Sequence, residues 1–355
     1  MERDSKRIRI LEKLRDEIVA GRFLPGSRLP TRDELSRNFR ASRVTIQRAL
    51  DRLNAEGFIE SRRRGGTSVT AHPPHLFRYG LVIPREPGSA DWVRFWTALC
   101  NEANALDPAR GRSISIYYGI DSRAPTREYL RLQDDVQNSR LAGVIFAAQP
   151  RFLEGTPLLE ERLVPMVSVT GTTGYQRMPG IGLNSHAFFD RSLDFLLARK
   201  RKRIAVLTVP GLSEGFDDFV TAGIAARGLI SHPWWTQQAT QSYPRAAFQI
   251  VRLLMQARDS AERPDGLIIT DDNLVEQATA GLVAAGVRVP EELDVVAHCN
   301  FPWPTPNVVP VTRVGYDSRK ILQAGMNAID QERSGKSAQH LTLIDAELES
   351  TLARI

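Results

Sequence analysis

The stretch ASRVTIQRALDRL, residues 41–53, decides the fold of the N-terminal part of this chain. Ser42 is a residue type that caps helix N-termini, and Gly57 follows the stretch as a helix stop. Apolar residues between them recur at helical spacing: Ile46, Ala49, Leu50 and Leu53. We therefore expect an amphipathic helix from about residue 43 that buries this stripe.

Two more helices and a hairpin are expected around it. Residues 6–20 carry Ile8, Leu11, Leu14 and Ile18 at helical spacing. Thr31 and Glu34 have the T-x-x-E spacing of a capping box and open a short helix that runs to about Asn38. Residues 58–70 read as two strands around a basic glycine turn at 62–66. Residues 1–70 are therefore predicted to form a winged helix-turn-helix.

A linker and a longer body follow. Residues 71–78 contain two prolines, so we expect a linker there. Beyond it, short β-branched runs alternate with helical patterns over more than 200 residues. The expected strands lie at 80–84, 113–119, 141–148, 164–170, 203–210, 265–270 and 293–298, and the expected helices at 92–105, 188–198, 246–257 and 274–285. This alternation predicts an α/β body with parallel sheets covered on both faces.

The charge is divided unevenly along the chain. The 355 residues have a formal net charge of +6, but residues 1–78 alone carry 18 Lys and Arg against 10 Asp and Glu. The N-terminal part is therefore expected to contact a polyanion, and the remainder of the chain is expected to have a different binding role.

Several function classes lack their motifs. There is no apolar run long enough to span a bilayer and no secretory signal pattern at the N-terminus, so a cytoplasmic protein is expected. Cys100 and Cys299 have no metal-ligand spacing, and neither a P-loop nor a G-x-S-x-G motif occurs. We expect no metal, no cofactor and no enzymatic activity.

Both parts resemble known families. The segments PGSRLPTRDELS (25–36), ASRVTIQRALDRL (41–53) and EGFIESRRRGGTSV (56–69) resemble the GntR family of DNA-binding domains. Residues 79–355, most clearly 264–298 and PVTRVGYD (310–317), are similar to LacI-type regulatory domains related to periplasmic sugar-binding proteins. The resemblance implies an effector-binding and dimerisation body of two lobes, roughly 79–185 with 314–340, and 186–313.

The resemblance also implies DNA contacts. The third helix would enter the major groove, where Arg can bind guanine and Gln can bind adenine, and the hairpin would supply the wing. The family commonly has Arg where this chain has Asp33 and a basic residue where it has Gln47. The candidate DNA-binding residues are Arg32, Ser42, Arg43, Thr45, Gln47, Arg48, Arg64, Gly66 and Thr67.

Ligand contacts are expected where strands of the two lobes end, with an aromatic side chain against the ligand. Of the positions chosen, Asp271 is the strongest, whereas Asp272 is expected to cap the next helix. LacI-like sensors often carry Arg at the Glu214 position and Asp at the Cys299-Asn300 position. The candidate ligand-binding residues are Arg85, Trp92, Gln149, Glu214, Phe216, Tyr243, Asp271 and Asn300.

These expectations combine into a ligand-responsive repressor. Such a protein would bind a near-palindromic operator as a dimer and respond to a sugar-like small molecule. One alternative is a winged-helix head fused to an aminotransferase-like enzyme body, which would need a Schiff-base lysine. Another is a sugar-binding module without a DNA function.

Overall fold

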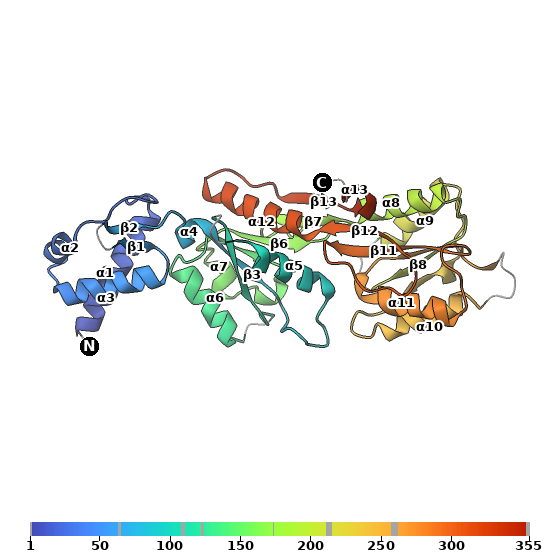
Figure 1. Ribbon diagram of the computed structural model, residues 1–355, viewed down its shortest axis with the longest axis horizontal. Helices are drawn as coiled ribbons and strands as arrows, with labels where there is room; N and C mark the ends of the chain where they lie inside the picture. The colour runs from blue at the N-terminus through green and yellow to red at the C-terminus, as the bar shows by residue number, and fades with distance from the viewer. Residues whose placement is uncertain are drawn as a thin grey trace.

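A computed structural model describes residues 2–62, 65–107, 111–121, 124–172, 174–210, 215–256 and 262–352. The molecule is elongated, with the N-terminal domain at one end and two sheets following it along the long axis (Figure 1). We call residues 2–70 the head and residues 74–352 the body. Within the described ranges, no helix is long and apolar enough to cross a membrane.

The head has the three helices and the hairpin expected from the sequence. Its elements are α1 (Glu2–Val19), α2 (Arg32–Asn38), α3 (Arg43–Ala55), β1 (Ile59–Arg62) and β2 (Gly66–Val69). The capping box of Thr31 and Glu34 is formed, and the Ser42 hydroxyl accepts from the Thr45 amide. The four predicted apolar residues of α3 are buried in the core of the head.

One detail of the first helix differs from the sequence prediction. Ile8 is 44% exposed, and Ile10 is buried instead, together with Leu14 and Ile18. The spacing from residue 10 to 14 to 18 places three side chains on one face of a helix, whereas Ile8 lies two positions from Ile10 and faces away.

The junction between head and body is more ordered than a linker. Pro74–Phe77 form a helical turn, α4, and Arg78 already belongs to the first strand of the body. Proline is well accommodated in the first turn of a helix because its missing N–H has no partner there, which explains why Pro74 does not prevent the turn. His75 on this turn is 8% exposed, and its ring stacks on Phe58 of the head.

The first lobe of the body contains a six-stranded sheet in the order β13-β7-β6-β5-β3-β4. Its strands are β3 (Arg78–Val82), β4 (Ser113–Tyr117), β5 (Gly143–Phe146), β6 (Met166–Thr170), β7 (Gly180–Asn184) and β13 (Leu341–Asp345), all paired in parallel. Helices α5 (Arg94–Ala105) and α12 (Ser318–Arg333) pack on one face, and α6 (Arg127–Gln137) and α7 (Pro157–Glu160) on the other.

The second lobe contains another six-stranded sheet, in the order β14-β12-β11-β10-β8-β9. Its strands are β8 (Ile204–Thr208), β9 (Thr236–Gln238), β10 (Gly266–Ile269), β11 (Asp294–Phe301), β12 (Thr312–Asp317) and the antiparallel β14 (Glu347–Leu348). Helices α8 (Ser185–Ala198) and α9 (Phe216–Ala226) pack on one face, and α10 (Arg245–Leu254) and α11 (Asp272–Ala284) on the other. The short helix α13 (Glu349–Leu352) follows β14.

The chain passes between the lobes after Asn184, after Asp317 and before β14. The second passage lies a few residues beyond the boundary at 314 expected from the sequence, because β12 stays paired with β11 as far as Asp317. Parallel strands end at the same edge of a sheet, so the ends of β3, β5, β8 and β10 all face the gap that these passages border.

Candidate DNA interface and ligand cleft

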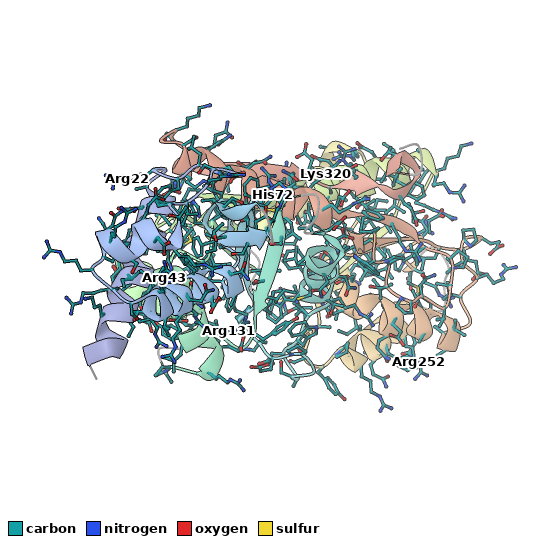
Figure 2. The ribbon with its side chains drawn as sticks, turned by 60° about the vertical axis from the view of Figure 1, so that its left-hand side comes forward. Arg22, Arg43, His72, Arg131, Arg252 and Lys320 are labelled. Atoms are coloured by element: carbon teal, nitrogen blue, oxygen red, sulfur yellow. The ribbon has the colours of Figure 1, made fainter. Side chains whose placement is uncertain are left out.

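Helix α3 presents a polar face to solvent. The side chain of Arg43 in its first turn is 75% exposed, and its Nε lies 2.7 Å from Asp33 Oδ1 of α2. Gln47, one turn further, donates from Nε2 to Asp51 Oδ1 at 2.6 Å. Both side chains can therefore reach a DNA groove, but each first has to leave an acidic partner on the head. Figure 2 labels Arg43 on the head.

The other DNA-binding candidates surround this face. Arg32, Asp33, Arg43 and Gln47 line one shallow depression between α2 and α3. Ser42 and Thr45 are tied together at the helix start, with their hydroxyl oxygens 2.9 Å apart, and Arg48 is exposed.

On the wing, Gly66 is exposed with a φ of 80°, a conformation that favours glycine, and Thr67 pairs with Ser61 across the hairpin. Arg64 lies outside the described residues.

Sequence reasoning did not single out Val44, which is 62% exposed beside Arg43 and lines the same depression. An exposed apolar side chain at the start of a recognition helix suits the methyl group of thymine. The signal available in the sequence was that Val44 lies outside the apolar stripe of this helix, among polar residues.

Two adjoining cavities lie between the lobes of the body. The first has a volume of about 520 Å³ and is named the Arg85 cavity; the second has about 400 Å³ and is named the Asp272 cavity. Val93 of the first lobe and Val209 and Gln241 of the second lobe line both, so the two cavities form one cleft.

In the Arg85 cavity, Arg85 is held by two carboxylates. Its NH1 donates to Asp121, and its Nε lies 3.6 Å from Asp91. Gln149 lines the same cavity and donates from Nε2 to the Gly174 carbonyl at 3.1 Å. The first cavity is therefore polar at one side, with its arginine already paired.

The Asp272 cavity holds two adjacent carboxylates, those of Asp271 and Asp272. The expectation that Asp272 caps the next helix is wrong. Asp271, in extended conformation, caps α11 by accepting from the Asn273 amide at 2.9 Å, and the helix begins at Asp272. Asp272 is the buried member, 2% exposed, and accepts from Asn300 Nδ2 at 2.7 Å. Strand β10 ends at Ile269 and the helix starts after only two further residues, so Asp271 occupies the capping position.

Burial raises the pKa of Asp272, because desolvation disfavours its charged form and the neighbouring Asp271 adds repulsion. His298, the hydrogen bond from Asn300, and Arg94 act in the opposite direction. The Nδ1 atom of His298 and the Oδ1 atom of Asn300 are buried and have no hydrogen-bond partner among the described residues.

An aromatic wall borders this cavity. The rings of Phe216, Phe189, Phe188, His298 and Tyr316 follow one another, with centroids 5.2, 5.7, 5.7 and 5.5 Å apart. Of these, sequence reasoning selected Phe216 alone. The others lie on α8, β11 and β12, and residue order alone does not bring these elements together.

Two further ligand candidates, Trp92 and Tyr243, lie outside the described lining of the two cavities, although Trp96 and Ser242 belong to it. Trp92 donates from Nε1 to Thr97 and packs against Trp96, and Tyr243 is 62% exposed. Glu214 lies outside the described residues.

A buried arginine connects the head to the first lobe. Arg15 of α1 is 5% exposed and donates from NH2 to Glu56 Oε2 at 2.7 Å and from NH1 to Asn138 Oδ1 at 2.6 Å. Glu56 belongs to the head, and Asn138 ends α6 of the body. Arg333 of α12 adds a bond from NH1 to the Leu76 carbonyl of the junction at 2.9 Å.

Comparison with known proteins agrees with this two-part organisation. Residues 6–69 match the family described as bacterial regulatory proteins, gntR family. The head is a GntR-family domain. Behind the GntR-family head, residues 193–348 match the periplasmic binding protein-like domain.

Individual relatives match either the GntR-family head or nearly the whole chain. The HTH-type transcriptional regulator TauR of Rhodobacter capsulatus is 33% identical over 86 residues, which cover 24% of this chain and 18% of TauR. The arabinose metabolism transcriptional repressor of Geobacillus stearothermophilus is 19% identical over 325 residues, or 87% of this chain and 86% of that protein.

Solved structures share the fold of the body. A LacI family transcriptional regulator from Arthrobacter sp. FB24, in complex with lactose, aligns with a TM-score of 0.58 and 15% identity over 77% of this chain and 97% of its own. A regulatory protein of the LacI family from Chloroflexus aggregans aligns with a TM-score of 0.57 and 16% identity over 77% and 96%. The body thus has the LacI-type two-lobed fold and not that of an aminotransferase.

Proposed function

We propose that the protein is a ligand-responsive transcription repressor that reads DNA with its GntR-family head and binds a small polar molecule between the lobes of its body. The observation that carries this proposal is the direct contact between the two parts. Because Arg15 of the head is bonded to Asn138 of the first lobe, a movement of that lobe also moves the head. The full-length similarity to the arabinose repressor supports the repressor role.

DNA recognition is assigned to the exposed face of α3. Arg43 and Gln47 would leave Asp33 and Asp51 to contact base edges, Val44 would meet an apolar base edge, and Ser42 with Thr45 would contact phosphates. Gly66 and Thr67 would place the wing against the backbone. Binding to chromosomal DNA assigns the protein to the cytoplasm.

Effector binding is assigned to the interlobe cleft. Two-lobed domains bind ligands between their lobes and close around them. The lactose complex of the Arthrobacter regulator supports a sugar-like effector for a body of this fold. The lobes are already bridged here, since the Arg94 amide of α5 donates to Asn273 Oδ1 at 3.0 Å and Arg94 NH2 lies 3.2 Å from Glu276 of α11.

We further propose that the body forms a dimer, so that two heads bind half-sites about one helical turn, roughly 10 bp, apart. A two-fold symmetric protein would then select a near-palindromic operator. We assign no enzymatic step and no cofactor to the body.

The proposal is tested by selecting DNA from a random-sequence library with the full-length protein. The expected result is an enriched motif with two-fold symmetry, bound as a dimer. The Arg43→Ala variant should bind the enriched motif more weakly and with relaxed preference at one base pair. Recovery of random sequences by the wild-type protein would refute sequence-specific DNA binding.

A further inference from the structure

We propose that the Asp272 cavity binds a small hydroxylated ligand that carries a protonated amine. This inference rests on the proposed function, because it gives the chemical class of the effector. It concerns the charge of the ligand, which neither the fold nor the similarity to other regulators determines.

The charge of the cavity lining is the first argument. Asp271 and Asp272 are adjacent carboxylates, and no Lys or Arg occurs among the described residues that line the cavity. Arg94 is close enough to influence Asp272, but it is paired with Glu276. A buried carboxylate without a cationic partner is unfavourable, and a ligand ammonium group supplies that partner.

The hydrogen-bonding groups of the cavity give the second argument, because three of its side-chain oxygens are placed as acceptors. Asn300 is 1% exposed and its Nδ2 is bonded to Asp272, whereas its Oδ1 receives no hydrogen bond within the part of the chain that the structure describes. Thr170 and Thr270, which also line the cavity, donate their hydroxyl hydrogens to the Gly171 carbonyl and to Thr208. The oxygens of both hydroxyls therefore remain as acceptors, and an ammonium group offers three donors and no acceptor.

The aromatic wall is the third argument. The rings of Phe188, Phe189, Phe216 and Tyr316 border the cavity that contains Asp272. The faces of aromatic rings carry partial negative charge and attract cations, most strongly where water is excluded. Carboxylates and aromatic rings that line the same cavity therefore favour a positively charged group over a neutral or anionic one.

The adjoining Arg85 cavity does not offset this preference. Its lining contains one described cationic side chain, Arg85, and this is already paired with Asp91 and Asp121. An anionic ligand would therefore meet two carboxylates in one cavity, which are hydrogen-bonded to the uncharged Gln241, Asn273 and Asn300, and an ion-paired arginine in the other. A neutral sugar could satisfy the hydrogen-bond acceptors but would leave the negative charge uncompensated.

The test compares ligands that differ only in the amine. Glucosamine, galactosamine and mannosamine are titrated into the full-length protein beside their parent hexoses and their N-acetyl derivatives, with binding followed by calorimetry and by the melting temperature. At least one amine is expected to bind about tenfold to a hundredfold more tightly than its parent hexose, the range of a hydrogen bond to a charged partner, and its N-acetyl derivative should lose the gain.

The Asp272→Asn variant keeps the shape of the side chain and its bond to Asn300 but removes the charge. It should lose the preference for the amine while its far-UV circular dichroism and DNA affinity stay as in the wild type. Asp218→Asn, which removes an exposed carboxylate on α9 that is not among the residues lining either cavity, is the matched control and should retain the preference.

Equal binding of amines and parent hexoses, binding of the N-acetyl derivatives alone, or no binding of any amine would overturn the inference. Each of these results leaves the proposed function standing as long as the protein selects a DNA motif. The proposed function fails separately, through the absence of such a motif, whatever the sugar titrations give.

Discussion

The guanidinium group of Arg15 in the head donates to Asn138 at the end of α6 in the body, over 2.6 Å. The same group is paired with Glu56 and lies over the ring of Phe58, which in turn stacks on His75 of the junction. Residues from α1, α3, the junction and α6 therefore meet around one buried cation. In the proposed function, this contact would couple a lobe movement to the DNA-binding head.

Removing only the body's side of this contact should loosen the head. In Asn138→Ala, Arg15 keeps its pair with Glu56 but loses its acceptor on the body, so the junction should open more often. Amide hydrogen exchange of residues 71–77 is expected to be faster than in the wild type. The exposed Asn54→Ala on α3 is the control, and identical exchange in both variants would show that the contact does not restrain the head.

The buried histidine of the junction should make stability depend on pH. Desolvation, with a smaller effect of Arg333, lowers the pKa of His75 to about 4 from its ordinary 6.5. The unfolded chain therefore takes up a proton below about pH 6.5 while the folded protein does not, and the free energy of unfolding should fall by up to about 3 kcal/mol as the pH drops from about 6.5 to about 4.

His75→Phe keeps a ring against Phe58 and removes this titration, so its unfolding free energy should fall less over that pH range. Denaturant unfolding at several pH values measures the difference. His72→Phe, at an exposed position of the junction, should behave as the wild type. A wild-type slope in His75→Phe would mean that another group causes the pH dependence.

The ion pair between Arg43 and Asp33 should compete with DNA. Exposed pairs contribute roughly 0.2–1 kcal/mol, so Asp33→Asn is expected to tighten binding to the selected motif by up to about fivefold. Arg43→Ala should weaken it by about 1–3 kcal/mol. Fluorescence anisotropy with labelled DNA measures both; equal affinity of all three proteins would remove Arg43 from the interface.

Binding of an amine ligand should depend on pH through Asp272. Burial raises the pKa of this carboxyl group, and a cationic ligand favours its ionised form, so binding releases a proton wherever Asp272 is partly protonated. Affinity should therefore fall as the pH is lowered through the raised pKa. The groups facing Asp272 are Asp271, His298, Asn300 and Arg94.

Calorimetry in buffers of different ionisation enthalpy detects the released proton. The proton release should disappear in Asp272→Asn. A pH dependence that is the same in the variant would show that a group other than Asp272 releases the proton.

Local signals predicted the head almost completely. Ser42 and the pair of Thr31 and Glu34 are capping residues whose partners lie within three positions in the chain, so sequence spacing alone determines the contacts. The α/β alternation of the body was readable in part: the seven expected strands correspond to strands of the two sheets, but β7, β12 and β13 were not among the expected strands. Short edge elements such as β9 and β14 have no pattern long enough to detect.

Contacts between distant segments were beyond sequence reasoning. Asp271 and Asp272 are both suitable caps, and only the point at which α11 begins decides which one is buried. The aromatic wall joins α8, α9, β11 and β12, and the bond of Arg15 to Asn138 spans 123 positions. Such contacts depend on how the lobes and the head pack, for which a single sequence gives no periodic signal.

The most direct test of the whole account is the affinity of the full-length protein for its selected DNA motif, measured by anisotropy with and without the sugar or amino sugar that raises its melting temperature most. The account predicts that the ligand changes the dissociation constant by about 5–150-fold, the usual range of coupling between two sites, and that Asp272→Asn abolishes the change. A ligand that binds the body while the DNA affinity stays the same would contradict it.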